Sequence, residues 1–476
     1  MMEKTDLINY IVNCLEHKSL SVFLGSGMSY DACKIDWKSL VAPYIPQLPG
    51  NDPDLIKGLQ YYVTQNKIDV GDFKREIALK FLGLKYNLNH ELLARLPIRN
   101  YWTTNFDTLI EDALKTTYEQ RDVMKTNDSF ITAEERRDNV VYKLHGDANE
   151  PRGIVILQDD YDDYPKSHCN FVTALENELA TNSMLFLGYS FNDPDIKNII
   201  NLLKLKTPTL QTHLFILKRE CREKELAQRY WIDELTKKGI ITCLIDEYTE
   251  VEEILSRIYK KYMARKIFIS GSSCGEYGKF TENEAHDLLY RLGYKLIERF
   301  KDQDVNLISG YGLGVGPNIV EGAAEAVANN DLDFGKKILI YPFPKTYYCI
   351  HSEDRSPKLE EHFKHYREKM IEKCGIAFFL FGNKRDKAGN TIVADGVVKE
   401  FEIARKQGKY VFPIGSTGGA AKILADKVLA NYASYNKTSL DVERLYYELN
   451  LSKITADEII EKICAIIDLI AYRDDG

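Results

Sequence analysis

The chain has 476 residues, a formal net charge of −8 and a composition of 44% apolar and 28% charged residues. Since single hydrophobic cores stop growing at about 250–300 residues, we expect two or three domains. The acidic balance argues against a dedicated nucleic-acid binder, although a local basic pocket for a phosphate group is compatible with it.

The nine cysteines are scattered and form no C-x-x-C pair, which argues against a disulfide framework and against a zinc ribbon. The first 20 residues have the pattern of an amphipathic helix and lack the apolar core of a signal peptide. No apolar run approaches the ~18 residues of a transmembrane helix. We therefore expect a soluble, cytoplasmic protein with reduced thiols, no metal and no membrane or nucleic-acid partner.

Short apolar runs that end in glycine or polar residues predict strands throughout the first half. The clearest runs are at 19–25, 139–146, 184–190, 212–219 and 239–246. Helical patterns separate them, for example at 193–206, and this alternation predicts a parallel sheet covered on both faces. Residues 37–95 interrupt the alternation with helical sequence and predict an inserted helical module.

A second series of the same kind begins with "KIFISGSSCGEYGKF" at residue 266. It continues through "VNLISGYGLGVGPN", "KKILIYPFP", "CGIAFFLFGN" and "KYVFPIGS", and ends in an amphipathic helix at 455–472. We predict an α/β chain of two Rossmann-like parallel-sheet domains, 1–260 and 261–476, with the helical module in the first.

Four predicted strand ends in the first half carry small or polar residues. Singly, each has a plain structural explanation as a tight turn, a helix cap or a core histidine. Together they favour a ligand site, because open α/β sheets bind ligands beyond the carboxyl ends of their strands. The candidate residues are Gly25, Ser26, Gly27, Ser29, Asn105, Asp107, His145, Gly188 and Ser190.

This ordered set resembles the sirtuin (Sir2-like) family over roughly residues 1–260. The sirtuin motifs Gly-Ala-Gly-x-Ser, Thr-Gln-Asn-[Ile/Val]-Asp, His-Gly and Gly-x-Ser correspond to "GSGMS", "TTNFD", "HG" and "GYS" here. The resemblance implies an NAD site. In that site Asn105 orients water or ribose, Asp107 holds the nicotinamide end, and His145 is the general base on a ribose hydroxyl. The glycine turn with Ser26 and Ser29 would bind the phosphates, and the late Gly-x-Ser the adenosine side.

The chain departs from the sirtuin pattern in ways that bear on the reaction. Ser26 and Thr104 replace the usual Ala and Gln, and the Pro-Asp-Phe-Arg segment that follows the glycine turn is absent. The zinc module with its paired C-x-x-C motifs, which frames the acyl-lysine cleft of deacylating sirtuins, is also missing. These departures favour water as the nucleophile, because a fixed carboxamide and a neutral imidazole can place water at the ribose.

The second half has glycine-rich turns at 270–278 and 309–318 and resembles the SLOG family over about 266–420. It lacks the Pro-Gly-Gly-x-Gly-Thr loop of LOG phosphoribohydrolases, which favours a nucleotide sensor over a second hydrolase. The resemblance implies an effector site whose cations face a diphosphate. Its residues would be Gly271, Ser272, Arg367, Lys384, Gly396 and Glu400.

A sirtuin-like domain followed by a SLOG domain resembles the NAD-cleaving effectors of the Thoeris antiphage defence system. The resemblance implies an NAD+ glycohydrolase that depletes NAD in abortive infection. Its activator would be a cyclic ADP-ribose isomer made by a TIR-domain partner, and its state a homotetramer or larger assembly. NAD+ would be its substrate and no other cofactor is expected. Two alternatives stay open: a sirtuin-type lysine deacylase and a non-catalytic nucleotide-binding scaffold.

Overall fold

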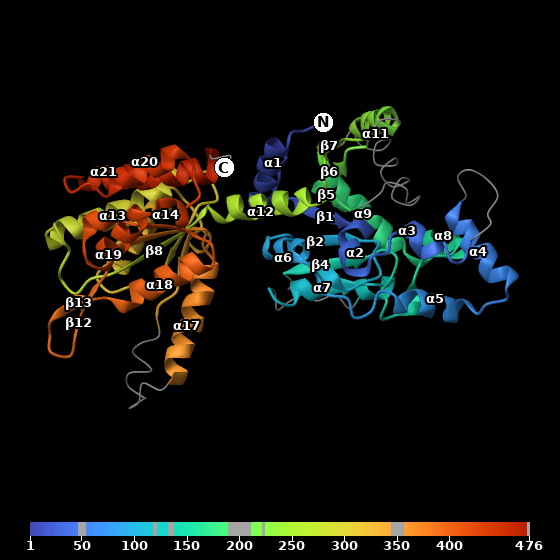
Figure 1. The fold of residues 1–476 in the computed structure, drawn as a ribbon, viewed down its shortest axis with the longest axis horizontal. Coiled ribbons are helices and arrows are strands. Elements are labelled where there is room, and N and C mark those ends of the chain that lie inside the picture. Colours follow the sequence, from blue (N-terminus) through green and yellow to red (C-terminus); the bar gives the residue numbers. More distant parts are fainter. Residues whose placement is uncertain are drawn as a thin grey trace. The chain divides into compact units, whose positions relative to one another are not determined.

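The computed structural model describes residues 1–45, 54–117, 121–131, 138–188, 211–220, 224–343 and 357–473. The chain forms two compact units, Met1–Tyr259 and Lys260–Gly476, which are coloured from blue to green and from yellow to red in Figure 1. Ser190 and the predicted helix at 193–206 lie outside the described residues.

The first unit is built on a parallel sheet of seven strands in the order β3-β4-β2-β1-β5-β6-β7. Every residue of β1, β4 and β5 is buried, because helices cover both faces of the sheet. The strands are β1 (Leu20–Leu24), β2 (Asn100–Thr103), β3 (Arg121–Met124), β4 (Asn139–Lys143), β5 (Ser183–Leu187), β6 (His213–Lys218) and β7 (Ile240–Ile245).

The predicted helical module is present between β1 and β2. Each of its four helices begins at an Asp or Asn whose side chain accepts a backbone N–H of the first turn. Leu59, Phe73 and Ile77 of the module share one apolar cluster with Phe106 and Ile156, which follow β2 and β4. The helices are α3 (Trp37–Val41), α4 (Leu55–Gln65), α5 (Val70–Leu79) and α6 (Leu88–Arg95).

The first unit has further helices, of which α1 (Lys4–Glu16) precedes β1 and α2 (Ser26–Cys33) directly follows it. The others are α7 (Leu109–Leu114), α8 (Gln158–Ser167), α9 (Cys169–Thr181) and α11 (Glu225–Lys237). The helix α12 (Glu250–Met263) crosses the boundary between the two units.

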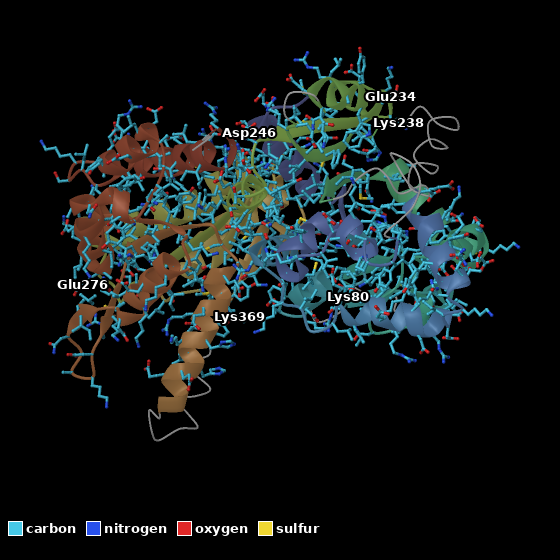
Figure 2. The ribbon with its side chains drawn as sticks, turned by 45° about the vertical axis from the view of Figure 1, so that its right-hand side comes forward. Lys80, Glu234, Lys238, Asp246, Glu276 and Lys369 are labelled. Carbon is cyan, nitrogen blue, oxygen red and sulfur yellow. The ribbon has the colours of Figure 1, made fainter. Side chains whose placement is uncertain are left out.

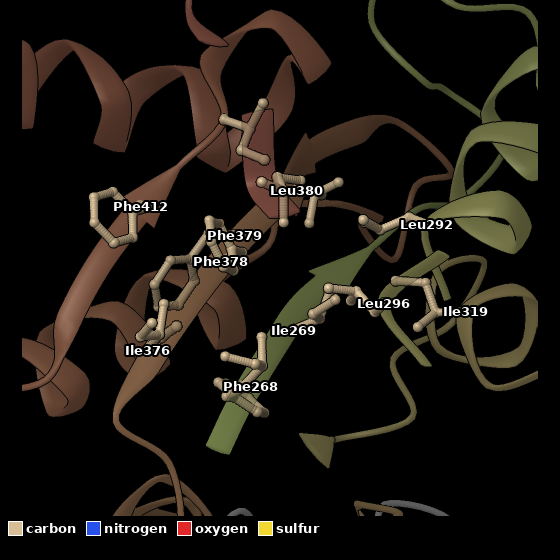
Figure 3. Packing of buried hydrophobic residues seen from close by; sticks show 14 of the residues in the cluster. Phe268, Ile269, Leu292, Leu296, Ile319, Ile376, Phe378, Phe379, Leu380 and Phe412 are labelled. Atoms are coloured by element: carbon tan, nitrogen blue, oxygen red, sulfur yellow. The ribbon is translucent and has the colours of Figure 1, made fainter. Parts of the chain in front are cut away.

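The second unit has a parallel sheet of five strands in the order β10-β9-β8-β11-β14. The apolar run at 376–381 forms β11 in its middle, with all six residues buried. Figure 3 shows Ile269 of β8 beside Phe378 of β11, with Leu292 and Ile319 packed from two helices. The strands are β8 (Lys266–Ser272), β9 (Asn306–Ser309), β10 (Ile338–Ile340), β11 (Ile376–Phe381) and β14 (Tyr410–Pro413).

Helices separate these strands as well, and a small antiparallel hairpin follows β11. The predicted closing amphipathic helix is confirmed as α21. The elements are α13 (Glu282–Arg299), α14 (Gly316–Asn329), α15 (Phe334–Lys337), α17 (Pro357–Glu372), β12 (Asn383–Arg385), β13 (Thr391–Val393), α18 (Asp395–Lys406), α19 (Gly419–Ala430), α20 (Leu440–Leu449) and α21 (Ala456–Asp468).

Each sheet reverses its strand order at one place. In the first unit the chain leaves β1 toward β2 and β4, then returns to β5 on the other side of β1. In the second unit it leaves β8 toward β9 and β10, then returns to β11. Ligands of open α/β sheets bind at the carboxyl ends of the strands at such switch points. The structure thus confirms the predicted pair of Rossmann-like parallel sheets.

Charged side chains cover the surfaces of both units, as Figure 2 shows for Glu234, Asp246 and Lys369, which are all exposed. Across the described ranges, no helix combines the length and the apolar character that crossing a membrane requires.

Candidate active site and effector site

The loops that follow β1, β2 and β4 border a cavity of about 420 Å³ in the first unit. Ser26, Ser29, Asn105, Asp107 and His145, which come from three separate motifs, all line it. Ser26 and His145, 119 positions apart in the chain, therefore meet at one place, because parallel strands end at the same edge of the sheet.

Gly27 and Gly188 bring the backbones that follow β1 and β5 into direct contact. The Gly27 N–H donates to Gly188 O at 2.9 Å. A Cβ on Gly188, whose φ is +61°, would lie 2.4 Å from the amide nitrogen of Met28, so only glycine fits there. This contact holds the first turn of α2, which begins at Ser26, at the switch point. A helix N-terminus in that position suits a phosphate.

The carboxamide of Asn105 is fixed by two hydrogen bonds. Its Nδ2 donates to Gly25 O at 3.0 Å and to Ser29 Oγ at 3.0 Å. A backbone carbonyl can only accept, so the amide nitrogen must face Gly25 and the orientation of the group is determined. The amide oxygen of Asn105 is then the atom that can accept a hydrogen bond from a water or a ribose hydroxyl.

Asp107 fixes the Ser29 side chain that contacts Asn105. The Ser29 hydroxyl donates to Asp107 Oδ2 at 2.6 Å, and the Leu109 N–H donates to Asp107 Oδ1 at 3.1 Å. A chain of hydrogen bonds thus runs from Asn105 through Ser29 to Asp107. The buried carboxylate keeps further lone pairs with which it can accept from a ligand amide, and its contact with nicotinamide stays a prediction.

His145 reaches the cavity from a sharp turn after β4. Its backbone oxygen accepts the Val155 N–H at 3.1 Å, and the ring of Tyr161 stands edge-on to the imidazole at 5.5 Å between centroids. Gly146 has φ +81°, and a Cβ there would lie 2.4 Å from Gly153 O. The turn therefore requires glycine at position 146, and it presents the imidazole of His145 to the cavity.

Asp36, Trp37 and Lys38 line the same cavity and were missed in the sequence. Asp36 accepts the Ser39 N–H at 2.7 Å and starts α3. These residues have the order acid, aromatic, cation, which is also the order of the sirtuin Asp-Phe-Arg segment. The signal was present as "DWK", but two of its three identities differ. Phe81 and Tyr161 also line the cavity, and no local motif marks them.

Among the described residues that line this cavity, Cys33 is the one thiol. Its Sγ donates to Ser29 O at 3.3 Å and to Ile35 O at 3.4 Å. Burial raises the pKa of the Cys33 thiol above its ordinary value, so the sulfur stays protonated and is a poor competitor of water. Within the described part of the chain, no group of three His, Cys, Asp or Glu side chains is placed to hold a metal ion.

In the second unit, Arg367 lies near the first turn of α18. Its guanidinium is 4.4 Å from the ring centroid of Phe343, and its Nε is 3.6 Å from Glu400 Oε1. Glu400 in turn accepts from Ser270 Oγ at 2.6 Å. A Cβ on Gly396 would meet Arg367 Nη2 at 3.5 Å. Three of the six predicted effector residues, Arg367, Gly396 and Glu400, are therefore brought together.

The other three predicted effector residues lie at the end of β8 and on the hairpin. Ser272 Oγ donates to Asn383 O at 3.1 Å, and a Cβ on Gly271 would lie 2.6 Å from Leu380 O in β11. Lys384 pairs with Asp395, the first residue of α18, and both side chains are more than 40% exposed, at 43% and 58%. Their roles in effector binding stay predictions.

The domain families agree with this two-unit arrangement. Residues 99–240 match the SIR2-like domain family, and residues 250–470 match the Sir2- and TIR-associating SLOG family, STALD.

Similar proteins extend over almost the whole chain. NAD(+) hydrolase ThsA of Bacillus cereus (strain MSX-D12) is 32% identical over 472 residues, which cover 95% of this chain and 96% of that protein. NAD(+) hydrolase ThsA of Enterococcus faecium is 31% identical and covers 98% of this chain and 99% of its own. Defense-associated sirtuin 2 of Bacillus subtilis is 23% identical over 44% of this chain and 22% of its own. The chain belongs to the ThsA family of NAD(+) hydrolases.

Proposed function

We propose that the protein is an NAD+ glycohydrolase that converts NAD+ and water to ADP-ribose and nicotinamide in its first domain, for which we predict the bounds 1–260. The observation that carries the proposal is the meeting of Asn105, Asp107 and His145 around one cavity of about 420 Å³. That cavity lies beside the first turn of α2, where Ser26, Gly27 and neighbouring backbone suit the pyrophosphate. Gly25 and Ser29 belong to this turn, and Gly188, which contacts it, would face the adenosine side of the bound NAD+.

The proposed chemistry needs a placed water and a proton acceptor. The bond between nicotinamide and ribose C1′ breaks, and its electron pair returns to the pyridine nitrogen, which leaves as a neutral amine. A water molecule, oriented by the hydrogen bond that it donates to the Asn105 amide oxygen, bonds to C1′ of the cationic sugar. His145 accepts the proton that is released, directly or through a ribose hydroxyl. Asp107 fixes Ser29 and Asn105 and contacts the nicotinamide end.

The test is to incubate the pure full-length protein with NAD+, with and without an acetylated peptide, and to separate the products. Nicotinamide with ADP-ribose supports the proposal, and both should disappear in His145→Ala. Acyl-ADP-ribose that forms only with the peptide would identify a lysine deacylase instead. If no turnover occurs under any condition, including the presence of candidate effectors, the remaining interpretation is a non-catalytic nucleotide-binding scaffold.

We further propose that the second domain, with predicted bounds 261–476, binds a cyclic ADP-ribose isomer and activates the first. The support is the cation Arg367 beside Gly396, in the first turn of α18, and Glu400, in its second turn, near the switch point of the second sheet. Lys384 adds a second cation for the diphosphate, and Gly271 and Ser272 shape the end of β8. An effector activates only if it binds the active state better than the idle one.

The biological setting follows from the same proposal. A TIR-domain partner makes the isomer after infection, and the protein then depletes cytoplasmic NAD+ as a homotetramer or larger assembly. Measuring NAD+ turnover against a panel of cyclic ADP-ribose isomers, with light scattering in parallel, tests both the identity of the activator and the assembly. Equal turnover with and without every isomer would remove the sensor role of the second unit.

A further inference from the structure

Lys143 is a fully buried lysine beneath the candidate active site. It is the last residue of β4, and its side chain has 0% exposure. Its ammonium donates to Phe106 O at 3.3 Å and to Asp107 O, two backbone carbonyls of the loop that follows β2. His145, in the loop after β4, comes two residues later in the chain. One ammonium therefore joins the loop of Asn105 and Asp107 to the loop of His145.

Two buried carboxylates balance this charge. Lys143 Nζ lies 3.0 Å from Glu111 Oε1 and 3.2 Å from Asp147 Oδ2. Burial raises the pKa of Glu111 above its ordinary value. Burial also disfavours the charged form of Asp147, but Lys143, the N–H of Asn149 and Lys125 hold the pKa of Asp147 below its ordinary value. Asp147 has partners of its own, since Asn149 donates to it twice, at 2.8 and 3.0 Å, and Lys125 lies 3.6 Å away.

Stability alone is a weak reason for this lysine. Replacing a buried ion pair by apolar side chains of similar size is often neutral or stabilising, because the desolvation of both charges is avoided. What an apolar side chain cannot supply is a donor to the carbonyls of Phe106 and Asp107. Those carbonyls belong to the two residues that follow Asn105, so the ammonium fixes the position of the loop that carries Asn105. A misplacement of about 1 Å in a reacting group costs on the order of 100-fold in rate.

We propose that Lys143 is a positioning residue for NAD+ hydrolysis. Its ammonium holds the turn of Asn105 and Asp107 at a fixed distance from the turn of His145, so that the water-orienting amide and the proton acceptor face the same ribose. The inference rests on the function proposed above. Lys143 itself is sealed from the cavity and takes no part in the chemical step.

The test compares two double and two single variants of the full-length protein. Lys143→Met/Glu111→Gln removes the ammonium and one carboxylate together, and Asp147 keeps Lys125 and Asn149, so no buried charge is left unbalanced. Glu111→Gln alone keeps both bonds from Lys143 to the carbonyls. Lys337→Met is the matched control, because Lys337 is a buried lysine of the second unit that donates to Phe300 O at 3.2 Å and to Gln303 O.

The readout is kcat per site that binds ADP-ribose, with the sites counted by calorimetry, so that unfolded protein does not enter the result. We expect Lys143→Met/Glu111→Gln to bind ADP-ribose and to lose roughly 10–100-fold in kcat, with a much smaller change in KM. Glu111→Gln and Lys337→Met should keep the kcat of the unaltered protein. A purely structural lysine would instead lower the number of binding sites and the unfolding temperature without changing kcat per site.

Should the Met variant fail to fold, Lys143→Gln/Glu111→Gln replaces it, since a shorter amide can still donate to one carbonyl; kcat per site should again fall. An unchanged kcat per site in either double variant overturns the inference. So does a loss in Glu111→Gln equal to that of the double variant, and so does failure of both double variants to fold. Absence of turnover in the unaltered protein with every effector would remove the proposed function, and this inference with it.

Discussion

The two units use the same device, a parallel sheet with one switch point, but they place different chemistry there. At the first, the groups that face the cavity include a carboxamide and an imidazole, and the carboxylate of Asp107 is held by Ser29 and a backbone N–H. At the second, Arg367 and Glu400 form an ion pair beside a helix N-terminus, and Lys384 and Asp395 form another.

This difference suits the two tasks proposed above. A reaction that builds positive charge on a sugar needs fixed dipoles and a proton acceptor, which act without drawing the substrate into a competing ion pair. A sensor for a diphosphate needs cations whose partners change when the ligand arrives, since only a ligand that distinguishes two states shifts the balance between them. The predictions below test this division, starting with the largest effect.

Replacement of His145 by Ala should lower NAD+ turnover about 10²–10⁴-fold, the usual range for loss of a general base. The measurement is nicotinamide release by the full-length protein, with and without effector. His168→Phe is the control, because His168 stacks on Tyr164 at 4.4 Å between ring centroids and does not line the cavity. Near-normal turnover in His145→Ala would show that a group other than His145 accepts the proton.

Asn105→Ala and Asn105→Asp should each lower turnover on the order of 100-fold, because both lose the fixed acceptor for water. The Asp variant is the sharper test. Its carboxylate has the size of the amide but would face Gly25 O with an oxygen in place of Nδ2, so it cannot keep the native orientation. Both variants should still bind effector in calorimetry. An active Asn105→Asp protein would show that the orientation is not needed.

His145 and Asn105 also show how much of the site can be predicted from the sequence. The strand ends were readable because buried parallel strands form continuous apolar runs, so the predicted strands at 139–146 and 239–246 appear as β4 and β7. Asn105 and His145 follow such runs directly. Their meeting at one edge then follows from parallel topology, which the alternation of strands and helices predicts.

Other parts of the site depend on tertiary packing and carry no local signal. Phe81 reaches the cavity because the helical module packs on the loops after β2 and β4, and Tyr161 reaches it from α8. Lys143 was visible as a charged residue inside an apolar run, but its partner Glu111 lies 32 positions earlier in the sequence, on α7. No periodicity of the sequence links two such positions, so this ion pair can be recognised only in the folded structure.

Acid should weaken the first unit through two buried histidines. Burial lowers the pKa of His90 and of His213 to about 4, and His213 Nδ1 accepts the Met184 N–H at 3.2 Å, which requires a neutral ring. In the unfolded chain both titrate near 6.5. The folded pKa is the lower one, so the unfolded state binds more protons. Stability is therefore complete above about pH 6.5 and is lost as the pH falls toward 4.

The expected loss at pH 5 is roughly 2 kcal/mol per histidine. Calorimetric scans of the full-length protein at pH 7 and pH 5, with hydrogen exchange to assign the transitions, measure it. His213→Gln should reduce the pH dependence of the transition that belongs to the first unit. If that transition moves equally in the variant and in the unaltered protein, His213 does not carry the effect.

Arg367→Ala should lower effector affinity and effector-stimulated turnover together, each by more than about 10-fold. The reason is that a hydrogen bond to a charged group contributes roughly 1.5–3 kcal/mol. Effector calorimetry and NAD+ turnover on the same preparation measure both quantities. ADP-ribose binding by the first unit should be unchanged. Normal effector binding in this variant would place the sensor site elsewhere in the second unit or remove it.

Lys384→Ala should have the smallest effect, and its salt dependence sharpens the contrast with Arg367. Lys384 is paired with Asp395 on the surface, where an ion pair contributes about 0.2–1 kcal/mol, so effector affinity should fall only a few-fold.

Exposed charges are screened at an ionic strength near 1 M, where the Debye length is about 3 Å. The loss from Lys384→Ala should therefore vanish at high salt, whereas the loss from Arg367→Ala, at a side chain only 8% exposed, should persist. Calorimetry of both variants at low and high salt measures this difference. If both variants lose the same effector affinity and keep that loss at high salt, the effector buries Lys384 as deeply as Arg367.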